Sequence, residues 1–594
     1  MPAPQNTWTE IEADAAAVER LARELALPAP LARVLAARGY ADVAAAQAFL
    51  CPDLRSHLVT PFEFPGAREA ALRIWAAIRE GRRIIVYGDF DVDGVAAAAT
   101  LATALRRLGA KVEAFLPLRD PEGYGLTFAA LERCLAEHAP FDGMLITVDC
   151  GINSLDEIAH LNSLGIEVIV TDHHEPGPVL PPAAVVVNPR IGASRGAEHL
   201  CGAGVAFKIA YALVALGRER GWYDGAPMGA DLLVAVGIAT VTDVVPLLGE
   251  NRVLVAGALR QWRRAGTGLQ ALLQRALRSG RDALTVHTFS FLLGPRLNAA
   301  GRMSSAMIAY ELLTTDDKDH AAALAAQLEG LNAERRGVET TIVAAARAQC
   351  GIADAPGAFH ADAVVAGGRI SEGWHPGVIG IVAARLTDAT GAPSAVVAFD
   401  DGGAGRGSVR AGEGYHAVEA LQAASGVLLG FGGHARAAGF TLKPGCFDAF
   451  KERFCAACGQ QRQKMAENPR LQRLDGWLTA DDITVAFFSE QQRLAPFGEG
   501  NHAPRWGLRN VTLEQVRVIG QGGEHLQAML RLDNGKSVRG VWFRNGHLAE
   551  ALHASAGTHT VVFALAQSTF GGEPVPEIRI HAIQESECDA WARE

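Results

Sequence analysis

Apolar runs of strand length alternate with helical segments from Arg82 onward, and this alternation constrains the fold more than any other feature of the chain. The runs RRIIVYG, KVEAFLP, MLITVDCG, EVIVTDHH and AAVVVNP follow one another, with helical stretches such as VAAAATLATALRRLG between them. This order is the signature of βαβ units and a parallel sheet. Because the runs are almost wholly apolar, helices must cover both faces of the sheet. The sequence therefore predicts an α/β fold for this region.

The pattern changes along the chain and divides it into five segments. Residues 1–75 are typical of short amphipathic helices broken by prolines, and we expect them to pack on the lobe that follows. The parallel-sheet lobe spans 76–303, a long connecting helix 304–350, and a second, smaller α/β lobe 351–468. From 469 to 594, strand-length runs alternate with glycine turns, which predicts a small all-β barrel of the OB type.

The ends and cysteines of the chain exclude several classes of protein. Its N-terminal residues include acids and no apolar core of a signal peptide. The longest alanine-rich apolar run, Val95 to Leu105, is far shorter than the roughly 20 residues that span a membrane. Nine cysteines in 594 residues form no disulfide framework, and the pair Cys455 and Cys458 on an expected helix indicates packing. We expect a cytoplasmic protein without membrane contact.

Positive charge is concentrated in one stretch of an otherwise acidic chain, whose net charge is −10. Nine arginines and one acid, Asp282, lie between Arg252 and Tyr310. Such a stretch is expected where a protein holds a polyanion. The alternative is the solvated face of two helices. The arginines are Arg252, Arg260, Arg263, Arg264, Arg275, Arg278, Arg281, Arg296 and Arg302.

Carboxylates and imidazoles follow the apolar runs of the first lobe. They are Asp89, Asp91 and Asp93 after the first run, Asp149 after a later one, His173 and His174 after the next, and Asp243 after GIATVT. In an open parallel sheet, ligands bind outside the carboxyl ends of the strands. We therefore expect these side chains to converge on one crevice.

Crowded carboxylates repel each other and cannot all stay ionised without cations. Carboxylate and imidazole ligands suit manganese or magnesium better than zinc, and two such ions about 3.5–4 Å apart can promote phosphodiester hydrolysis. A single strand-end Asp could instead cap the next helix, but helix capping does not explain the whole set. On an extended segment Asp89, Asp91 and Asp93 would share one face, and Gly94 would turn the chain into the next helix. A calcium loop is excluded, because Thr100 stands where that loop needs a Glu.

The ordered motifs resemble those of the DHH phosphoesterases. D-F-D-V-D-G, V-D-C-G, D-H-H and T-D-V-V-P-L carry the resemblance in the first lobe, and F-G-G-H-A-R-A-A-G in the second resembles the DHH-associated domain. R-D-P-E-G-Y-G-L, G-P-R-L-N-A-A-G-R and A-P-F-G-E-G-N are similar to motifs of the branch that degrades single-stranded DNA from its 5′ end. The resemblance covers almost the whole chain beyond residue 60.

The resemblance implies a role for each matching residue. The implied ligands of two Mn²⁺ or Mg²⁺ ions are Asp89, Asp91, Asp93, Asp149, His173 and Asp243. His174 is expected to contact the scissile phosphate, so it counts as catalytic with the ligands. The expected substrate-binding residues are Arg119, Arg296, Arg302, His375, Ser408, Arg410 and His434. Arg119, Ser408 and Arg410 would hold the 5′ phosphate. His375 precedes a proline at an apparent helix start, where N–H groups favour a phosphate. Each second-lobe residue could alternatively be structural.

Two features depart from the family pattern. Ala411 replaces the serine that usually follows the arginine of the phosphate pocket, so a hydroxyl contact is missing. The segment from Leu471 to Glu594 has 11 Lys and Arg against 15 Asp and Glu, whereas an OB-fold binds single strands in a basic groove. Its aromatics Trp506, Trp542 and Phe543 could stack on bases or form the core. We expect the arginine-rich stretch to carry as much of the strand as the barrel.

The implied function is a 5′→3′ exonuclease that releases mononucleotides from single-stranded DNA during recombination and repair. A phosphodiesterase for short oligonucleotides or cyclic dinucleotides is the first alternative, and a non-catalytic single-strand-binding protein is the second. The first alternative would lack the barrel and A-P-F-G-E-G-N, and the second would not need crowded carboxylates. A helicase and a single-strand-binding protein are the expected partners, and we expect a monomer because one chain supplies both lobes.

Overall fold

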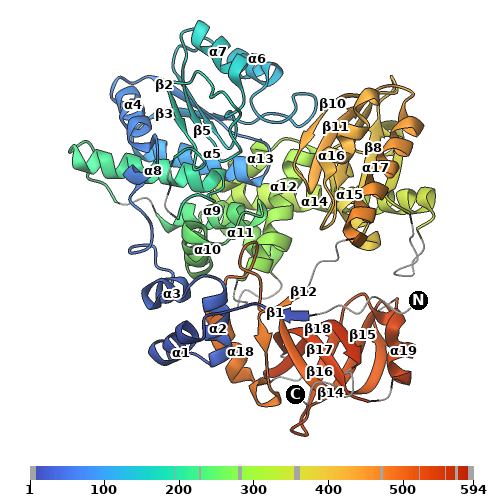
Figure 1. The fold of residues 1–594 in the computed structure, drawn as a ribbon. Coiled ribbons are helices and arrows are strands. Elements are labelled where there is room, and N and C mark those ends of the chain that lie inside the picture. The colour runs from blue at the N-terminus through green and yellow to red at the C-terminus, as the bar shows by residue number, and fades with distance from the viewer. Residues whose placement is uncertain are drawn as a thin grey trace. The chain divides into compact units, whose positions relative to one another are not determined.

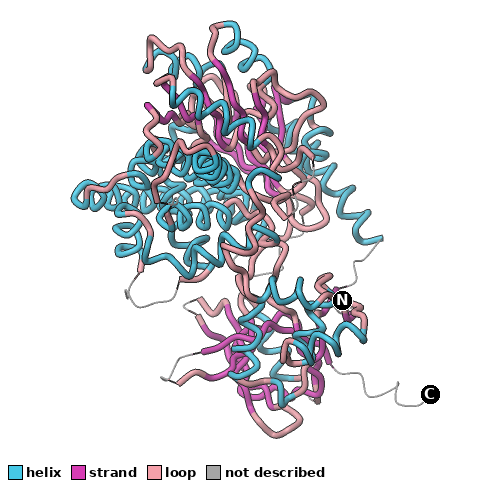
Figure 2. The backbone as a smooth tube through the Cα atoms, turned by 90° about the vertical axis from the view of Figure 1, so that its left-hand side faces the viewer, coloured by secondary structure: helices cyan, strands magenta, loops and turns pink. Residues whose placement is uncertain are grey.

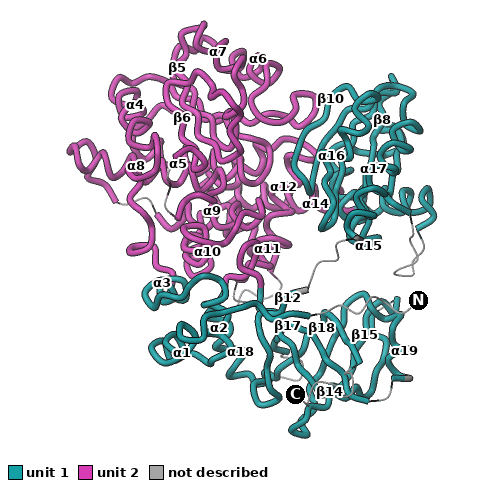
Figure 3. The backbone as a smooth tube through the Cα atoms, in the orientation of Figure 1, with its two compact units in different colours: residues 1–51, 337–495, 503–594 teal, residues 52–336, 496–502 magenta. Residues whose placement is uncertain are grey.

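The computed structural model describes the chain as two compact units (Figures 1 and 3). One unit comprises residues 52–336 and 496–502, and the other comprises 1–51, 337–495 and 503–594. Among the described residues, no helix is both long enough and apolar enough to cross a membrane. The described residues are 8–192, 194, 196–226, 229–277, 284–352, 361–467, 472–520, 522–555, 557–568 and 573–585.

A five-stranded parallel sheet forms the centre of the first lobe, the unit of residues 52–336 and 496–502. Its order is β3-β2-β4-β5-β6, and every neighbouring pair is parallel. The predicted parallel sheet is therefore confirmed. The strands are β2 (Arg83–Tyr87), β3 (Lys111–Phe115), β4 (Met144–Val148), β5 (Glu167–Thr171) and β6 (Val185–Val187).

Helices cover both faces of this sheet, as the apolar strands require. Successive residues of a strand point to opposite faces, so Ile84 and Val86 of β2 join one core while Ile85 and Tyr87 join another. The first core includes helices α4, α5 and α8, and the second includes α6 and α7. These helices are α4 (Ala67–Arg79), α5 (Val92–Arg107), α6 (Phe128–Glu137), α7 (Leu155–Ser163) and α8 (Gly202–Glu219).

The rest of the first lobe is helical and corrects the prediction of one helix over 304–350. Two helices occupy that segment, and Asp317 between them accepts a 2.8 Å hydrogen bond from the His320 N–H, which begins the second. Aspartate is a preferred helix cap, so the break has a local cause. The helices are α9 (Ala230–Thr242), α10 (Gly249–Gln261), α11 (Thr267–Ala276), the π-helix η3 (Thr288–Leu293), α12 (Gly294–Met303), α13 (Met307–Thr314) and α14 (Lys318–Cys350).

The second lobe, residues 361–467, is a smaller α/β domain. Its sheet has the order β10-β11-β9-β8-β7, with β7 and β8 parallel and the other pairs antiparallel. Cys458 is buried in its core, as packing requires. The elements are β7 (Val364–Arg369), α15 (Ile379–Thr390), β8 (Ser394–Phe399), β9 (Gly405–Arg410), α16 (Ala417–Ala423), β10 (Leu428–Gly433), β11 (Ala437–Leu442) and α17 (Phe447–Glu467).

The C-terminal strands close into a barrel, which Figure 2 shows as the strand-rich part of the chain. The ring runs β14-β15-β16-β18-β17, and β17 pairs again with β14. Closure leaves no free sheet edge and is typical of OB-type barrels. The elements are β13 (Gly476–Trp477), α18 (Val485–Gln491), β14 (Trp506–Ile519), β15 (His525–Arg531), β16 (Ser537–Trp542), α19 (Ala549–Ala554), β17 (His559–Ser568) and β18 (Val575–Glu585).

The N-terminal segment differs from its predicted place on the first lobe. Strand β1 (Trp8–Glu10) pairs in parallel with β12 (Gln472–Leu474), and Arg38 forms a 3.0 Å ion pair with Asp475. Residues 1–51 therefore group with the C-terminal strands, and only the chain from Pro52 belongs to the first lobe. The helices of this segment are α1 (Ala15–Glu24), α2 (Ala29–Ala37) and α3 (Val43–Leu50).

Candidate metal centre

Three neighbouring strands bring carboxylates and imidazoles to one edge of the first-lobe sheet. β2 leads to Asp89, β4 to Asp149, and β5 to His173 and His174. Because β2, β4 and β5 are adjacent and parallel, the residues that follow them meet at the carboxyl edge. The sequence predicted this convergence from the order of the apolar runs.

Asp243 reaches the same place from a helix, whereas the sequence predicted a strand end. It is the C-cap of α9, a helix whose residues from Leu232 to Val241 are all buried. A short apolar run bounded by turns does not distinguish a buried strand from a buried helix. The apolar periodicity therefore could not show which element carries Asp243.

The D-F-D-V-D-G segment is a helix start, which corrects the prediction of three carboxylates on an extended strand. Asp91 caps α5 and accepts hydrogen bonds from the N–H groups of Asp93 (2.9 Å) and Gly94 (3.2 Å). Asp93 lies in the first helical turn. A Cβ on Gly94 would lie 2.5 Å from the backbone nitrogen of Asp89, so the glycine permits close packing rather than a turn. Helix capping and metal binding are thus compatible roles here.

Asp93 is held by the start of a second helix. Its two carboxylate oxygens accept hydrogen bonds from the N–H groups of Gly202 (2.6 Å) and Ala203 (2.8 Å) in the first turn of α8. Helix N-termini favour negative charge. A Cβ on Gly202 would lie 2.4 Å from Cβ of Asp149, so only glycine lets α8 approach both carboxylates.

The ligand atoms form overlapping groups around His173. Its Nε2 lies 3.1 Å from Oδ1 of Asp149, 3.6 Å from Oδ2 of Asp93 and 3.7 Å from Oδ2 of Asp243. Three sets of ligand atoms each lie within 4.8 Å of one another: Asp89, Asp91 and Asp149; Asp93, His173 and Asp243; and Asp149, His173 and His174. Asp149 belongs to two sets, which is the arrangement that two neighbouring ions sharing a ligand require.

Several of these buried atoms have no hydrogen-bond partner among the described residues. They are both carboxylate oxygens of Asp89, Oδ1 of Asp149 and Nε2 of His173. A buried polar atom without a partner costs free energy, and a cation would satisfy all four. The donor set of carboxylate oxygens and one imidazole fits Mn²⁺ or Mg²⁺.

The charge states of these groups also favour a cation. Burial and the charge of Asp91 raise the pKa of Asp89 to about 8. Burial and the neighbouring carboxylates raise the pKa values of Asp149 and Asp243 well above their usual range. Burial lowers the pKa of His173, which keeps it as the neutral imidazole that ligates metals. A divalent ion would replace the protons that these carboxyl groups otherwise hold.

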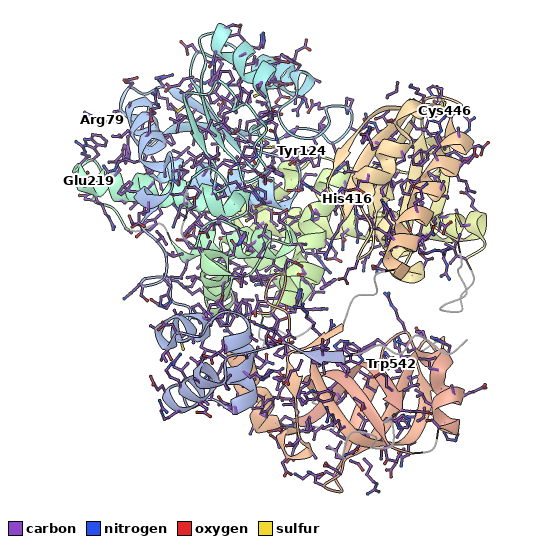
Figure 4. All side chains as sticks on the ribbon, viewed as in Figure 1. Arg79, Tyr124, Glu219, His416, Cys446 and Trp542 are labelled. Atoms are coloured by element: carbon purple, nitrogen blue, oxygen red, sulfur yellow. The ribbon has the colours of Figure 1, made fainter. Side chains whose placement is uncertain are left out.

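Asp172 and Tyr124 are two residues that the sequence reasoning missed. Oδ1 of Asp172 accepts hydrogen bonds from the N–H groups of His173 (2.7 Å) and His174 (3.1 Å) and pairs with Nδ1 of His174 at 2.7 Å. Its Oδ2 accepts from the Ile152 N–H at 3.0 Å. The Tyr124 hydroxyl lies 2.7 Å from Nε2 of His174, and Figure 4 labels this side chain. The signal was present, since D-H-H and E-G-Y-G-L contain both residues.

His174 therefore has both ring nitrogens engaged, unlike His173. Burial lowers the pKa of His174, but the hydrogen bond and charge of Asp172 and the charges of the ligand carboxylates outweigh it and raise that pKa to about 9. The ring is therefore cationic near neutral pH, which disfavours metal binding and favours contact with an anion. This charge state supports the predicted phosphate contact rather than a ligand role.

A pocket of about 290 Å³ opens beside the carboxylates. Arg119 lies on its wall, stacked 3.9 Å above the Phe90 ring, with its Nε donating to the Gly301 carbonyl at 3.0 Å. A Cβ on Gly301 would lie 2.1 Å from the Phe90 carbonyl, which explains the glycine of G-P-R-L-N-A-A-G-R. The lining residues are Phe90, Asp91, Val92, Asp93, Arg119, Tyr124, Thr242, Asp243, Asn298 and Arg302.

Arg252, Arg260 and Arg296 bond to other parts of the first lobe, whereas Arg263, Arg264 and Arg275 are exposed, so the arginine-rich track for the strand stays a prediction. Arg252 is 2% exposed and donates to the Pro496 carbonyl, and Arg260 donates to the Pro52 carbonyl. Arg296 pairs with Glu329 at 2.5 Å and donates to the Leu292 carbonyl. Arg302 alone of the described stretch lines the pocket with the carboxylates. Arg278 and Arg281 lie outside the described residues. Sequence proximity could not show which guanidinium groups would be buried.

Ser408 and Arg410 lie together on β9 of the second lobe. Arg410 donates to the Ser408 hydroxyl at 3.0 Å and has no carboxylate partner among the described residues. Burial lowers the pKa of Arg410. Gly380 in the first turn of α15 packs so closely that its Cβ would lie 3.1 Å from the Ser408 hydroxyl. A buried cation without a carboxylate partner is a candidate anion site.

The two second-lobe histidines have weaker support. His434 is exposed after β10, at the turn into β11. The sequence predicted a helix start at His375, but α15 begins at Ile379. The His375 carbonyl accepts the N–H groups of Val378 and Ile379, so these N–H groups are already engaged.

The aromatic residues of the barrel divide between the core and the surface. Trp506 is fully buried and its Nε1 donates to Gln491 at 2.8 Å, so this residue is core. Phe543 is 52% exposed and packs edge-on to His525. Trp542, labelled in Figure 4, is partly buried. Only Phe543 and Trp542 of the three can offer a face to a base.

The parallel sheet and its acidic edge define a DHH-type phosphoesterase. Residues 83–238 match the N-terminal domain of the DHH family, 361–460 match the DHHA1 domain, and 474–582 match the RecJ OB domain. These three matches fall on the first lobe, the second lobe and the barrel in turn.

Known proteins that match most of the chain identify the family within this class. The single-stranded-DNA-specific exonuclease RecJ of Bacillus subtilis (strain 168) is 34% identical over 93% of this chain and 67% of its own length. That of Escherichia coli (strain K12) is 34% identical over 81% of this chain and 84% of its own length. The chain belongs to the RecJ family. It spans about two thirds of the B. subtilis relative.

Solved structures of one relative contain Mn²⁺ or Mg²⁺, the two metals that the sequence predicted. The structure of RecJ from Thermus thermophilus in complex with Mn²⁺ is 32% identical, covers 99% of this chain and 81% of its own, and has a TM-score of 0.79. The complex of that protein with Mg²⁺ is 30% identical, covers 98% and 79%, and has a TM-score of 0.73. The fold class is therefore confirmed over the described chain.

Proposed function

We propose that the chain is a metal-dependent 5′→3′ exonuclease that hydrolyses single-stranded DNA to mononucleotides. The observation that carries this proposal is the overlap of ligand groups at Asp149 and His173, with buried ligand atoms that lack partners among the described residues. Relatives named single-stranded-DNA-specific exonuclease are 34% identical over 93% and 81% of this chain, which includes all three matched domains or most of them. A role in DNA recombination and repair belongs to the same proposal.

The proposed ligands divide into two sets. Asp89 and Asp91 would hold one Mn²⁺ or Mg²⁺ ion, and Asp93, His173 and Asp243 the other, with Asp149 shared. Two such ions, when bound, supply an activated water and stabilise the charge that develops on phosphorus. The residues that hold them act by fixing the coordination geometry.

Other residues of the first lobe would bind and orient the substrate. Asp172 pairs with the ring nitrogen Nδ1 of His174 and accepts the backbone N–H groups of His173 and His174, so the imidazole is preorganised to contact a phosphate oxygen. Arg119 and Arg302 line the pocket beside the carboxylates, where they would bind phosphate oxygens. Arg296 is left out of this set because Glu329 already neutralises it.

Ser408 and Arg410 are the proposed anchor of the 5′ phosphate. Their support is the hydrogen bond between them and the absence of a carboxylate partner for Arg410 among the described residues. Ala411 removes a hydroxyl from this pocket, so the guanidinium would carry most of the binding. His375 and His434 are proposed as weaker phosphate contacts, and Arg119 as a further 5′-phosphate contact.

The two rival functions lack specific support. A phosphodiesterase for short oligonucleotides or cyclic dinucleotides does not require the barrel, which matches the RecJ OB domain. A non-catalytic binding protein gains nothing from carboxyl groups with raised pKa values in a buried cluster. The exonuclease explains both features.

The partners follow from the substrate. A helicase would supply single strands and a single-strand-binding protein would cover them, so both are proposed partners. A monomer is the proposed state because one chain carries both lobes and the barrel. The cytoplasmic location that the sequence predicts fits a DNA substrate.

The test is digestion of 5′-labelled single-stranded and blunt duplex DNA with Mn²⁺, by the wild type, Asp149→Ala and Asp142→Ala. Asp142 is an exposed acid two residues before β4, so its variant controls for the loss of one acidic charge near the same strand but away from the centre. We expect mononucleotides from single strands with the wild type and Asp142→Ala, and none with Asp149→Ala. Undigested single strands would overturn the proposal, and preferred cleavage of dinucleotides would favour the first rival.

A further inference from the structure

The motif A-P-F-G-E-G-N has no role in the chemistry described so far. Residues 496–502, which comprise the motif after Ala495 together with His502, group with the first lobe and share its colour in Figure 3, although the chain before and after them belongs to the other unit. The C-terminal part of the chain therefore contributes one short segment to the first lobe. We call this segment the 496–502 hairpin.

The hairpin is a tight and internally bonded turn. Gly498 and Asn501 face each other and exchange backbone hydrogen bonds of 3.0 and 3.2 Å. Gly500 has a φ of +69°, which favours glycine. The side chain of Asn501 is 1% exposed and donates to the Pro496 carbonyl at 2.8 Å, which closes the base of the turn.

The hairpin contacts the segment that follows Asp243. The Leu247 N–H donates to the Glu499 carbonyl at 2.8 Å. A Cβ on Gly500 would lie 3.0 Å from Cβ of Pro246, and one on Gly498 would lie 2.6 Å from the Leu247 side chain. The two glycines thus allow backbone to lie directly against T-D-V-V-P-L. A side chain at Gly500 would press on Pro246, and one at Gly498 would press on the Leu247 side chain.

The buried Arg252 adds a second attachment. Its guanidinium donates to the same Pro496 carbonyl at 3.3 Å. Arg252 lies in the first turns of α10, directly after the segment that bears Asp243. The hairpin is therefore bonded at its tip to Leu247 and at its base to Arg252.

Among the described residues, Asp243, like Asp89, is placed by its backbone and not by side-chain hydrogen bonds, which distinguishes it from Asp91 and Asp93. Asp91 and Asp93 accept hydrogen bonds from helix N–H groups. No side-chain hydrogen bond of Asp243 is present among the described residues, where its close polar neighbours are the candidate ligands Asp93 and His173. The next residue, Val244, has a φ of +60°. A valine holds this conformation only where its surroundings impose it.

We propose that the 496–502 hairpin is a positioning element for Asp243, which fixes the segment from Val244 to Leu247 and so sets the affinity of the centre for one of its two divalent ions. This inference rests on the proposed metal-dependent function. It makes the C-terminal part of the chain necessary for a complete metal site. The C-terminal motif then serves the metal centre and not the binding of DNA.

The test compares Gly500→Ala with Gly221→Ala in the full chain. Both positions have nearly equal φ values, +69° and +67°, but a Cβ on Gly221 meets nothing within 4 Å. Backbone strain is thus matched, and only Gly500→Ala presses on Pro246. Calorimetric titration with Mn²⁺ should show one ion bound about tenfold more weakly by Gly500→Ala, the scale of a lost outer-shell contact. Gly221→Ala should bind as the wild type does.

Activity provides a second readout that a general loss of stability would not reproduce. The exonuclease rate of Gly500→Ala should fall at low Mn²⁺ and recover at high Mn²⁺. Asn501→Ala, which opens the base of the hairpin, should behave in the same way. Unchanged Mn²⁺ affinity in both hairpin variants, or a loss of rate that Mn²⁺ does not restore, would overturn the inference. A wild type that binds no Mn²⁺ would instead overturn the proposed function.

Discussion

The metal centre of the first lobe and the candidate phosphate anchor of the second lobe are built in opposite ways. The metal centre crowds buried carboxylates, each placed by a strand end or a helix end. The anchor is one arginine on β9 whose near partner is the hydroxyl of Ser408. Like charges gathered in one buried place require a cation to explain them. A single cation without a carboxylate partner indicates an anion but not which anion.

This difference determines how far the residues of each region alone indicate what that region binds. At the metal centre, the charge and the donor atoms of the residues themselves indicate that a divalent cation binds. The anchor gains its 5′-phosphate role from the family resemblance, to which the structure adds burial and the lack of a carboxylate partner among the described residues. Variants of the two regions should therefore differ in kind: the first should abolish hydrolysis, and the second should change which ends are used.

The largest effect is expected for Asp93→Asn. Asparagine keeps one oxygen for the N–H groups of α8 but removes the charge and one metal ligand. We expect the exonuclease rate to fall at least about a thousandfold, because a catalytic metal supplies several kcal/mol of transition-state stabilisation. Asp231→Asn, an acid in the first turn of α9, is the control and should keep its rate. A drop of less than tenfold would remove Asp93 from the ligands.

A smaller effect is expected for Asp172→Asn, which tests the support of the centre. The amide nitrogen would face the donor N–H of Ile152 or the donors of His174, so one hydrogen bond must be lost. Loss of an outer-shell partner typically costs about 10–100-fold. The rate with saturating Mn²⁺ should fall by that factor, while Asp156→Asn, exposed on α7, should not change it. An unchanged rate would show that His174 needs no orientation.

Sequence alone could predict the strand-end part of the centre because strand order and apolar runs are local signals. Asp89, Asp149 and His173 follow apolar runs directly, and parallel neighbours must end at the same edge. Asp243 was also predicted to join this cluster, but its apolar run GIATVT belongs to the helix α9 and not to a strand. The positioning role of Asp172 was missed because D-H-H does not show which of its members turns inward to bond the backbone.

The predictions that were wrong concern long-range packing. β1 pairs with β12, more than 450 residues away along the chain, and no local pattern marks such a partner. Arg252 and Arg296 are indistinguishable from surface arginines in the sequence, yet one is buried against Pro496 and the other pairs with Glu329. A cluster of arginines in the sequence therefore indicates an anion-binding surface only once the burial and the partners of each guanidinium group are known.

The second-lobe anchor is tested by Arg410→Lys. Lysine keeps the charge but cannot bond Ser408 and a phosphate with a planar fork. The ratio of rates on 5′-phosphorylated and 5′-hydroxyl single strands should fall about tenfold, the scale of one hydrogen bond to a charged group. Arg369→Lys, exposed at the end of β7, is the control. An unchanged ratio with both variants would leave the anchor without a role at the 5′ end.

The smallest effect is expected in the stability of the metal-free protein. Burial and Asp91 raise the pKa of Asp89 to about 8, whereas an unfolded Asp titrates near about 4. The folded state therefore holds a proton that the unfolded state releases, so stability falls as the pH rises from about 4 to about 8. With EDTA, the melting temperature should be several degrees lower at pH 8 than at pH 5.5, at about 2–4 °C per kcal/mol for a domain of 150–250 residues.

Two further measurements test the origin of this pH dependence: the addition of Mn²⁺, and the replacement of Asp89 by a neutral side chain. Mn²⁺ should raise the melting temperature more at pH 8 than at pH 5.5. At pH 5.5 the ion must displace protons from the carboxyl groups, whereas at pH 8 part of these protons has already dissociated. Asp89→Asn should reduce the pH dependence in EDTA, since asparagine has no proton to lose, while Asp149 and Asp243 keep their contributions. Arg410→Lys should leave it as it is, because no carboxylate of the described chain pairs with Arg410. An equal pH dependence in the wild type and Asp89→Asn would show that the first-lobe carboxylates are not under the strain that distinguishes them from the second-lobe anchor.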